Sequence, residues 1–99
     1  MSKDLHSENL DNLLDGILTL RTREEAYRFF EDLCTVGEIE ALQQRFAVAR
    51  MLRSEQTYQD IADATGASTA TISRVRRALD YGDDGYDLVL KRLDSRGDD

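Results

Sequence analysis

The sequence contains no proline, a single cysteine and a single histidine among its 99 residues. With Cys34 alone, an intramolecular disulfide is excluded, and the apolar helical pattern beside Leu33 predicts a core cysteine. With His6 as the only histidine, no His/Cys metal cluster and no Ser/His or Cys/His catalytic pair can be assembled. The six glycines form neither a GxxxxGK[ST] loop nor a GxGxxG turn. We therefore expect no catalytic residues, no metal site, no cofactor and no enzyme activity.

Long apolar runs are also missing. No run approaches the roughly 18 residues of a membrane span, and the start, MSKDLHSENLDNL, has no apolar signal-peptide core. These features predict a cytoplasmic protein without a membrane partner. Apolar residues make up 40% of the chain, which together with the lack of proline favours an all-helical globular protein over a disordered acidic chain.

The length predicts a single domain over residues 1–99 with a modest core. A chain of this size buries only about two-thirds of its unfolded surface, so a second subunit would add to the core.

Helix starts are signalled by three segments of the form Thr-x-x-acid. A threonine hydroxyl can accept hydrogen bonds from the free amides of a first helical turn, and the acid three residues later can reach back to the cap. The segments are TREE from Thr22, TVGE from Thr35 and TYQD from Thr57, with Glu25, Glu38 and Asp60 as the acids.

Apolar residues recur at helical spacing through the first half of the chain, which predicts three helices. The first covers roughly residues 5 to 20, the second follows Thr22, and the third runs from Thr35 to near Ser54. Their stripes are core or dimer surface. They consist of Leu10, Leu13, Leu14, Ile17 and Leu18; of Ala26, Phe29, Phe30 and Leu33; and of Ile39, Leu42, Phe46, Ala49 and Leu52.

The stretch TYQDIADATGASTATISRVRR, residues 57 to 77, fits a helix-turn-helix over about residues 57–79, with Tyr58 as its first position. Gly66 falls where the turn requires a positive φ, and Ser68 is a good N-cap for the second helix. A small residue, Ala62, is expected where the helices cross. The core between them is expected to consist of Ile61, Ile72 and Val75. The alternative is an ordinary helical hairpin that contains a glycine.

Charge is segregated along the chain. The whole sequence has 13 Lys+Arg against 20 Asp+Glu, a net charge of −7, yet between Ala64 and Leu79 there are three arginines and no acid. A basic second helix suits the major groove of double-stranded DNA: small hydroxyl residues approach base edges, and arginines hold phosphate or guanine. The candidate DNA-binding residues are Gln59, Ser68, Thr69, Ala70, Thr71, Ser73, Arg74, Arg76 and Arg77.

Residues 38 to 74, EIEALQQRFAVARMLRSEQTYQDIADATGASTATISR, resemble the core of the tryptophan-repressor family, and the whole chain resembles its YerC/YecD branch. The resemblance implies an all-α fold of about five to six helices, an intertwined homodimer, a DNA-reading helix at about residues 68 to 79, and a transcriptional-repressor role. The C-terminal segment, DYGDDGYDLVLKRLDSRGDD, predicts a Gly-Asp linker, a short helix near residues 86 to 93, and a flexible acidic tail at about residues 94–99.

The same resemblance implies an effector pocket between two arginines, at Arg45 and Arg74. This chain departs from the family pattern after the second arginine, because Val75 stands in place of a glycine and Ala78 in place of a serine. Both changes argue against tryptophan as a corepressor and leave any effector unidentified. The alternative for Arg45 is a surface charge or an ion pair.

Two functions remain open from the sequence. One is a dimeric, sequence-specific DNA-binding regulator, and the other is a helix-turn-helix-shaped module that contacts another protein, such as part of the transcription machinery. The arginine-only segment favours DNA, whereas the overall acidity favours a protein partner.

Overall fold

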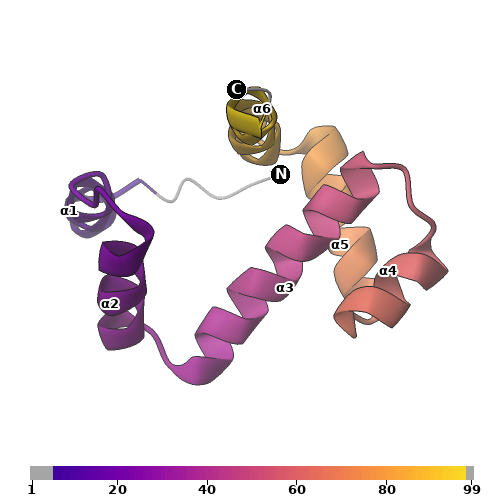
Figure 1. Ribbon diagram of the computed structural model, residues 1–99, viewed down its shortest axis with the longest axis horizontal. Coiled ribbons are helices and arrows are strands. Elements are labelled where there is room, and N and C mark those ends of the chain that lie inside the picture. Colours follow the sequence, from indigo (N-terminus) through magenta and orange to yellow (C-terminus); the bar gives the residue numbers. More distant parts are fainter. Residues whose placement is uncertain (1–5, 98–99) are drawn as a thin grey trace. The chain divides into compact units, whose positions relative to one another are not determined.

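The computed structural model describes residues 6–97, and within that range the secondary-structure elements are helices joined by short turns and loops (Figure 1). This confirms the predicted all-α class. Residue 5 of the predicted first helix and residues 98–99 of the predicted tail lie outside the described range. The helices are α1 (Glu8–Ile17), α2 (Arg23–Leu33), α3 (Val36–Arg53), α4 (Tyr58–Thr65), α5 (Thr69–Tyr81) and α6 (Gly85–Gly97). In this range no helix is both long enough and apolar enough to cross a membrane.

Internal contacts divide the chain into two compact units, with the boundary after Ile39 inside α3. The first unit holds α1, α2 and the first turn of α3, and the second holds the rest of α3 with α4, α5 and α6. The single-domain organisation remains a prediction from the sequence.

The predicted caps are present at all three Thr-x-x-acid segments. At the start of α3 the bonds are reciprocal: the Glu38 amide donates to the Thr35 hydroxyl at 3.1 Å, and the Thr35 amide donates to the Glu38 carboxylate at 2.8 Å. The Thr22 and Thr57 hydroxyls also accept from amides three residues later, both at 3.1 Å. The carboxylate of Glu25, however, accepts from the amide of Arg21, one residue before the predicted cap.

The first unit contains no buried side chain in α1 or α2. The helix α1 is shorter than predicted, because Ser7 caps its start and the chain turns at Leu18. Several of its apolar side chains are open to solvent, with Leu14 45% and Leu18 80% exposed. The prediction of a core cysteine is wrong for this chain: Cys34 is half-buried at the C-cap of α2, where the backbone becomes extended.

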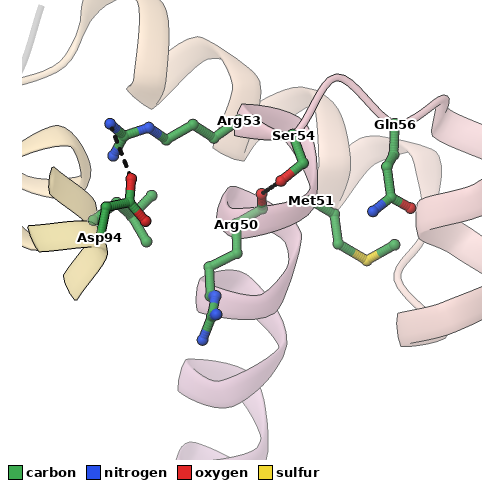
Figure 2. Close-up of a pocket in the computed structure, with 7 residues that line it drawn as sticks. Arg50, Met51, Arg53, Ser54, Gln56 and Asp94 are labelled. Atoms are coloured by element: carbon green, nitrogen blue, oxygen red, sulfur yellow. Dashed lines mark hydrogen bonds and ion pairs between the residues drawn. The ribbon is translucent and has the colours of Figure 1, made fainter. Parts of the chain in front are cut away.

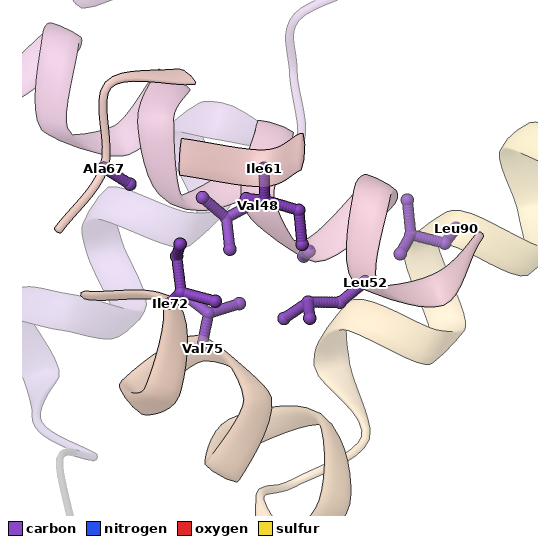
Figure 3. Packing of buried hydrophobic residues seen from close by; sticks show 8 residues of the cluster. Val48, Leu52, Ile61, Ala67, Ile72, Val75 and Leu90 are labelled. Carbon is purple, nitrogen blue, oxygen red and sulfur yellow. The ribbon is translucent and has the colours of Figure 1, made fainter. Parts of the chain in front are cut away.

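The second unit has a small core to which four helices contribute (Figure 3). The predicted core residues Ile61, Ile72 and Val75 are all buried, at 0%, 1% and 2% exposure. Three further members were not among the predicted core residues: Val48 of α3, Ala67 before α5 and Leu90 of α6. On α3, Val48 is buried beside Ala49 and Leu52, on the same face of the helix. Among the described residues the core consists of Val48, Ala49, Leu52, Ile61, Ala67, Ile72, Val75 and Leu90.

The turn between α4 and α5 is held by local hydrogen bonds. Gly66 has the predicted positive φ, +72°, and donates its amide to the Ala62 carbonyl at 2.8 Å. The Thr65 hydroxyl donates to the Ile61 carbonyl at 2.7 Å and accepts from the Ala67 amide at 3.1 Å. These bonds set the direction in which α5 leaves the turn.

The helix α6 is longer than predicted. It continues from residue 93 through Gly97, so residues 94–97 of the predicted tail are helical. The helix is tied to the core by Leu90, which is 4% exposed. Its side chain adds an apolar anchor to a segment whose sequence is otherwise rich in charge.

Candidate nucleic-acid interface

The N-terminus of α5 is built by two hydroxyl residues of the candidate set. The Thr71 amide donates to the Ser68 hydroxyl oxygen at 3.1 Å, and the two side-chain oxygens are also 3.1 Å apart with Ser68 as the donor. The cap satisfies an otherwise free amide of the first turn. Ser68 and Thr71 therefore position the helix, and their hydroxyls already have partners.

Burial divides α5 into two sides. Ile72 and Val75 are buried against α3 and α4, and Leu79 is partly buried on the same side. The side chains that face solvent include a run of small residues near the helix start followed by arginines, as the sequence predicts. They are Thr69, Ala70, Ser73, Arg74, Arg76 and Arg77.

The three arginines of α5 differ in their surroundings. Arg74 and Arg77 lie three residues apart, on the outward side, and neither forms an ion pair with any described residue. The Nε atom of Arg76 instead contacts the Asp80 carboxylate at 3.2 Å. The unpaired positive charge of the interface is therefore concentrated on Arg74 and Arg77.

Gln59 is the one candidate that lies on α4. It is exposed, and its side-chain amide donates to the Asp63 carboxylate at 2.8 Å. A contact between Gln59 and DNA would have to compete with this bond.

Two residues at the end of α5 were missed by the sequence reasoning, which counted charge only as far as Leu79. Asp80 lies four residues after Arg76, a spacing at which opposite charges meet on a helix. Tyr81 lies four residues after Arg77 and is 84% exposed, so its phenol extends the outward face of the helix. The spacing of four residues, from Arg76 to Asp80 and from Arg77 to Tyr81, is the sequence signal that indicates both residues.

The two candidate effector residues, Arg45 on α3 and Arg74 on α5, are exposed. Val75, which follows Arg74, is turned into the core beside Val48 and Ile72 (Figure 3). Ala78 is exposed. The valine thus occupies space inside the protein that a glycine would leave empty.

A separate cleft of about 380 Å³ lies between the end of α3 and α6 (Figure 2). Arg53 crosses from α3 to Asp94 on α6, where its Nη2 lies 3.6 Å from the carboxylate. Its Nη1 is buried and has no hydrogen-bond partner among the residues that the structure describes. Neither Arg45 nor Arg74 lines this cleft. Its walls consist of Arg50, Met51, Arg53, Ser54, Gln56, Leu90 and Asp94.

In the part of the chain that the structure describes, no three His, Cys, Asp or Glu side chains are placed to hold a metal ion. What the described residues do present is a capped helix with a buried apolar side and an exposed side of small hydroxyl residues and arginines. A tight turn with a left-handed glycine joins it to the preceding helix. These features define a helix-turn-helix protein.

Residues 8–94 match the family model of the Trp repressor protein, and the chain belongs to the Trp repressor family. That family consists of DNA-binding regulatory proteins, not enzymes. Within it the chain is of the YerC type: it is 56% identical over 89 residues to YerC of Bacillus subtilis, which covers 90% of this chain and 86% of YerC.

Two further comparisons agree with this assignment. The Trp operon repressor homolog of Chlamydia caviae is 30% identical over 97 residues, with 97% of this chain and 96% of that protein covered. The crystal structure of a TrpR-like protein from Eubacterium eligens is similar with a TM-score of 0.87 and 58% identity. The match covers 90% of this chain and 92% of the other.

Proposed function

We propose that this protein is a sequence-specific DNA-binding transcriptional repressor that acts as a homodimer through α4 and α5. The observation that carries the proposal is the division of α5 into two sides. One side is fixed in the core by Ile72 and Val75, and the other presents Arg74 and Arg77 to solvent without ion-pair partners among the described residues. Such a helix can enter a major groove with its geometry set in advance.

Within this face, the residues near the helix start have a different role from those further along. Thr69, Ala70 and Ser73 are short enough to approach base edges and would set the preferred sequence. Arg77 would hold backbone phosphate, and Arg74 would contact either phosphate or guanine. Ser68 and Thr71 contribute through the cap.

The dimer is supported by apolar surface that a single chain leaves uncovered. Leu18, Val36 and Leu33 are 80%, 73% and 48% exposed, and neither α1 nor α2 contains a buried residue. Large apolar side chains left exposed in this number are typical of an interaction site. A two-fold dimer would place two copies of α5 about one DNA turn apart, roughly 34 Å, and would select a palindromic site.

We propose that the protein binds its DNA site in the absence of L-tryptophan. Val75 is 2% exposed and belongs to the protein core, and Ala78 carries no hydroxyl. The recognition helix is therefore supported by packing in the absence of a ligand.

The test is a salt titration of binding to mixed genomic DNA fragments, followed by sequencing of the bound fraction. We expect log affinity to fall linearly with log salt concentration, since phosphate contacts release counterions, and an operator to be enriched. In an Arg77→Gln variant the slope should fall by about one unit for all DNA. If wild-type protein shows neither salt-dependent binding nor enrichment, the function is recognition of another protein through the same face.

A further inference from the structure

Arg76 and Asp80 form an ion pair on the flank of α5, and this pair sets Arg76 apart from the other arginines of the helix. Arg76 Nε donates to Asp80 Oδ2 at 3.2 Å, and the two side chains are 51% and 45% exposed. The pair spans one helical turn, the spacing at which side chains on a helix surface meet. Both charged groups are thus partly withdrawn from solvent.

The position of Arg76 along the helix favours this arrangement. Arg76 follows Ile72 by four residues, and Ile72 is buried, so the side chain leaves α5 near the core-facing side. Arg77 and Arg74 lie on the outward side instead. Arg76 is therefore the arginine of α5 that can turn back toward the rest of the second unit.

Arg76 and Asp80 also line an open groove at the ends of α3 and α5 and the start of α6. Three carboxylates line this groove, from Glu55, Asp80 and Asp87, with Arg53 as the other cation. These carboxylates attract the positively charged guanidinium of Arg76 toward the groove. The last carbonyl groups of α5 add negative potential at the same end of the helix.

We propose that Asp80 is a positioning residue that holds Arg76 back from DNA phosphates and thereby limits the affinity of the protein for DNA of any sequence. This inference depends on the proposed function. The Asp80 carboxylate acts in two ways: it occupies the Arg76 guanidinium, and it repels phosphate near the C-terminal end of the recognition helix. The phosphate-binding charge of α5 is then reduced to Arg74 and Arg77.

The main test compares Asp80→Asn with Asp83→Asn for binding to operator-free, mixed-sequence DNA. The two variants remove the same charge, and Asp83 is exposed in the loop before α6. We expect Asp80→Asn to raise the affinity about 3- to 10-fold at low salt and to steepen the logarithmic salt slope by about one unit, because one more cation reaches phosphate. Asp83→Asn should change the affinity less than about twofold, because it removes the same net charge but leaves Arg76 paired.

A double-mutant cycle tests whether the effect passes through Arg76. In an Arg76→Gln background, the Asp80→Asn gain should shrink, because only the direct repulsion between Asp80 and phosphate is then removed. A gain of the same size with and without Arg76 would overturn the positioning role, as would equal effects of the two aspartate variants.

A second comparison needs no change at Asp80. Arg76→Gln alone should leave the salt slope nearly unchanged, whereas Arg77→Gln should flatten it by about one unit. An equal loss of slope in both variants would overturn the inference while leaving DNA binding established. Absence of salt-dependent binding in the wild-type protein would instead overturn the proposed function and the inference together.

Discussion

The amide of Gly66 donates to the carbonyl oxygen of Ala62 at 2.8 Å, the last such bond of α4, and Gly66 itself adopts a φ of +72°. The left-handed residue ends α4 and redirects the chain toward α5 within three residues. The geometry of the proposed DNA-binding face thus depends on a single backbone conformation that glycine adopts without strain.

We expect Gly66→Ala to lower the free energy of unfolding by about 1 to 2 kcal/mol, because a Cβ is disfavoured in the left-handed region. Apart from Gly66 and its two chain neighbours, no described residue has a heavy atom within 4 Å of a Cβ built at this position, so the cost is conformational. Gly37→Ala is the matched control, since Gly37 lies in α3 with equally open surroundings. It should raise stability by up to about 1 kcal/mol. Urea denaturation measures both, and a neutral Gly66→Ala would contradict this role of the turn.

Substitutions of Ser68 can separate its role as the N-cap of α5 from a contact with DNA. Ser68→Ala should lower stability by about 1 kcal/mol, because the Thr71 amide loses its acceptor. Ser68→Asp and Ser68→Asn should both keep the cap and the stability. Ser68→Asp should weaken DNA binding through repulsion of phosphate, whereas Ser68→Asn should not. Thermal denaturation and fluorescence anisotropy give the two readouts; equal DNA affinities of the Asp and Asn variants would place Ser68 away from the DNA.

The exposed apolar residues of the first unit predict a homodimer at low micromolar concentration. We expect multi-angle light scattering to give twice the 11.3 kDa chain mass. Replacing Leu18, which is 80% exposed, with glutamine should weaken the dimer. The dimer loses about 25 cal/mol of binding free energy for each Å² of apolar surface that is no longer buried in the interface. The exposed polar residue Thr19 offers a control in Thr19→Gln. A wild-type chain that is folded and monomeric would exclude the dimer.

L-tryptophan should not tighten DNA binding. A buried polar group of the ligand left unpaired costs about 1 to 3 kcal/mol, so an alanine in place of a serine at position 78 should lower the affinity for L-tryptophan about 5- to 150-fold. Calorimetry with L-tryptophan, paired with operator binding with and without it, is the measurement. Low-micromolar affinity coupled to tighter DNA binding would refute this expectation.

The same region yields a prediction for stability. Val75→Gly should cost about 2 to 4 kcal/mol, from the lost burial of the side chain and the low helix propensity of glycine. Ala78→Ser is the control, because Ala78 is exposed and the change should stay within about 0.5 kcal/mol. Chemical denaturation of the two variants compares them, and a Val75→Gly protein as stable as wild type would mean that Val75 does not support α5.

Arg53 is expected to contribute little to stability. Its Nη1 is buried without a hydrogen-bond partner among the described residues, which costs about 1 to 3 kcal/mol. Its ion pair with Asp94, which is 72% exposed, contributes only about 0 to 1 kcal/mol. Arg53→Met should therefore leave the free energy of unfolding unchanged or raise it by about 1 kcal/mol. Arg50→Met, at an exposed site one turn earlier, is the control. A loss above about 2 kcal/mol in Arg53→Met would show that the ion pair matters.

Much of the helix-turn-helix could be predicted because its determinants are local. The Ser68 cap joins residues three apart, and the Gly66 turn depends on the backbone freedom of one residue. Ile61, Ile72 and Val75 are recognisable from their offsets around that turn. The pair between Arg76 and Asp80 is equally local, and it was missed only because the charge count ended at Leu79.

Other features depend on segments that are far apart in the chain. Gln44 donates to the Thr65 carbonyl at 3.2 Å across 21 residues, and Arg53 reaches Asp94 on another helix. Spacing along a helix indicates which residues share a face, but the face that becomes buried is decided by the helices that pack on it. Local sequence was therefore sufficient to predict α5 and the exposure of its arginines. The burial of Val48 and Leu90 and the orientation of Arg53 were decided by tertiary packing, because only the folded chain brings α3, α5 and α6 into contact.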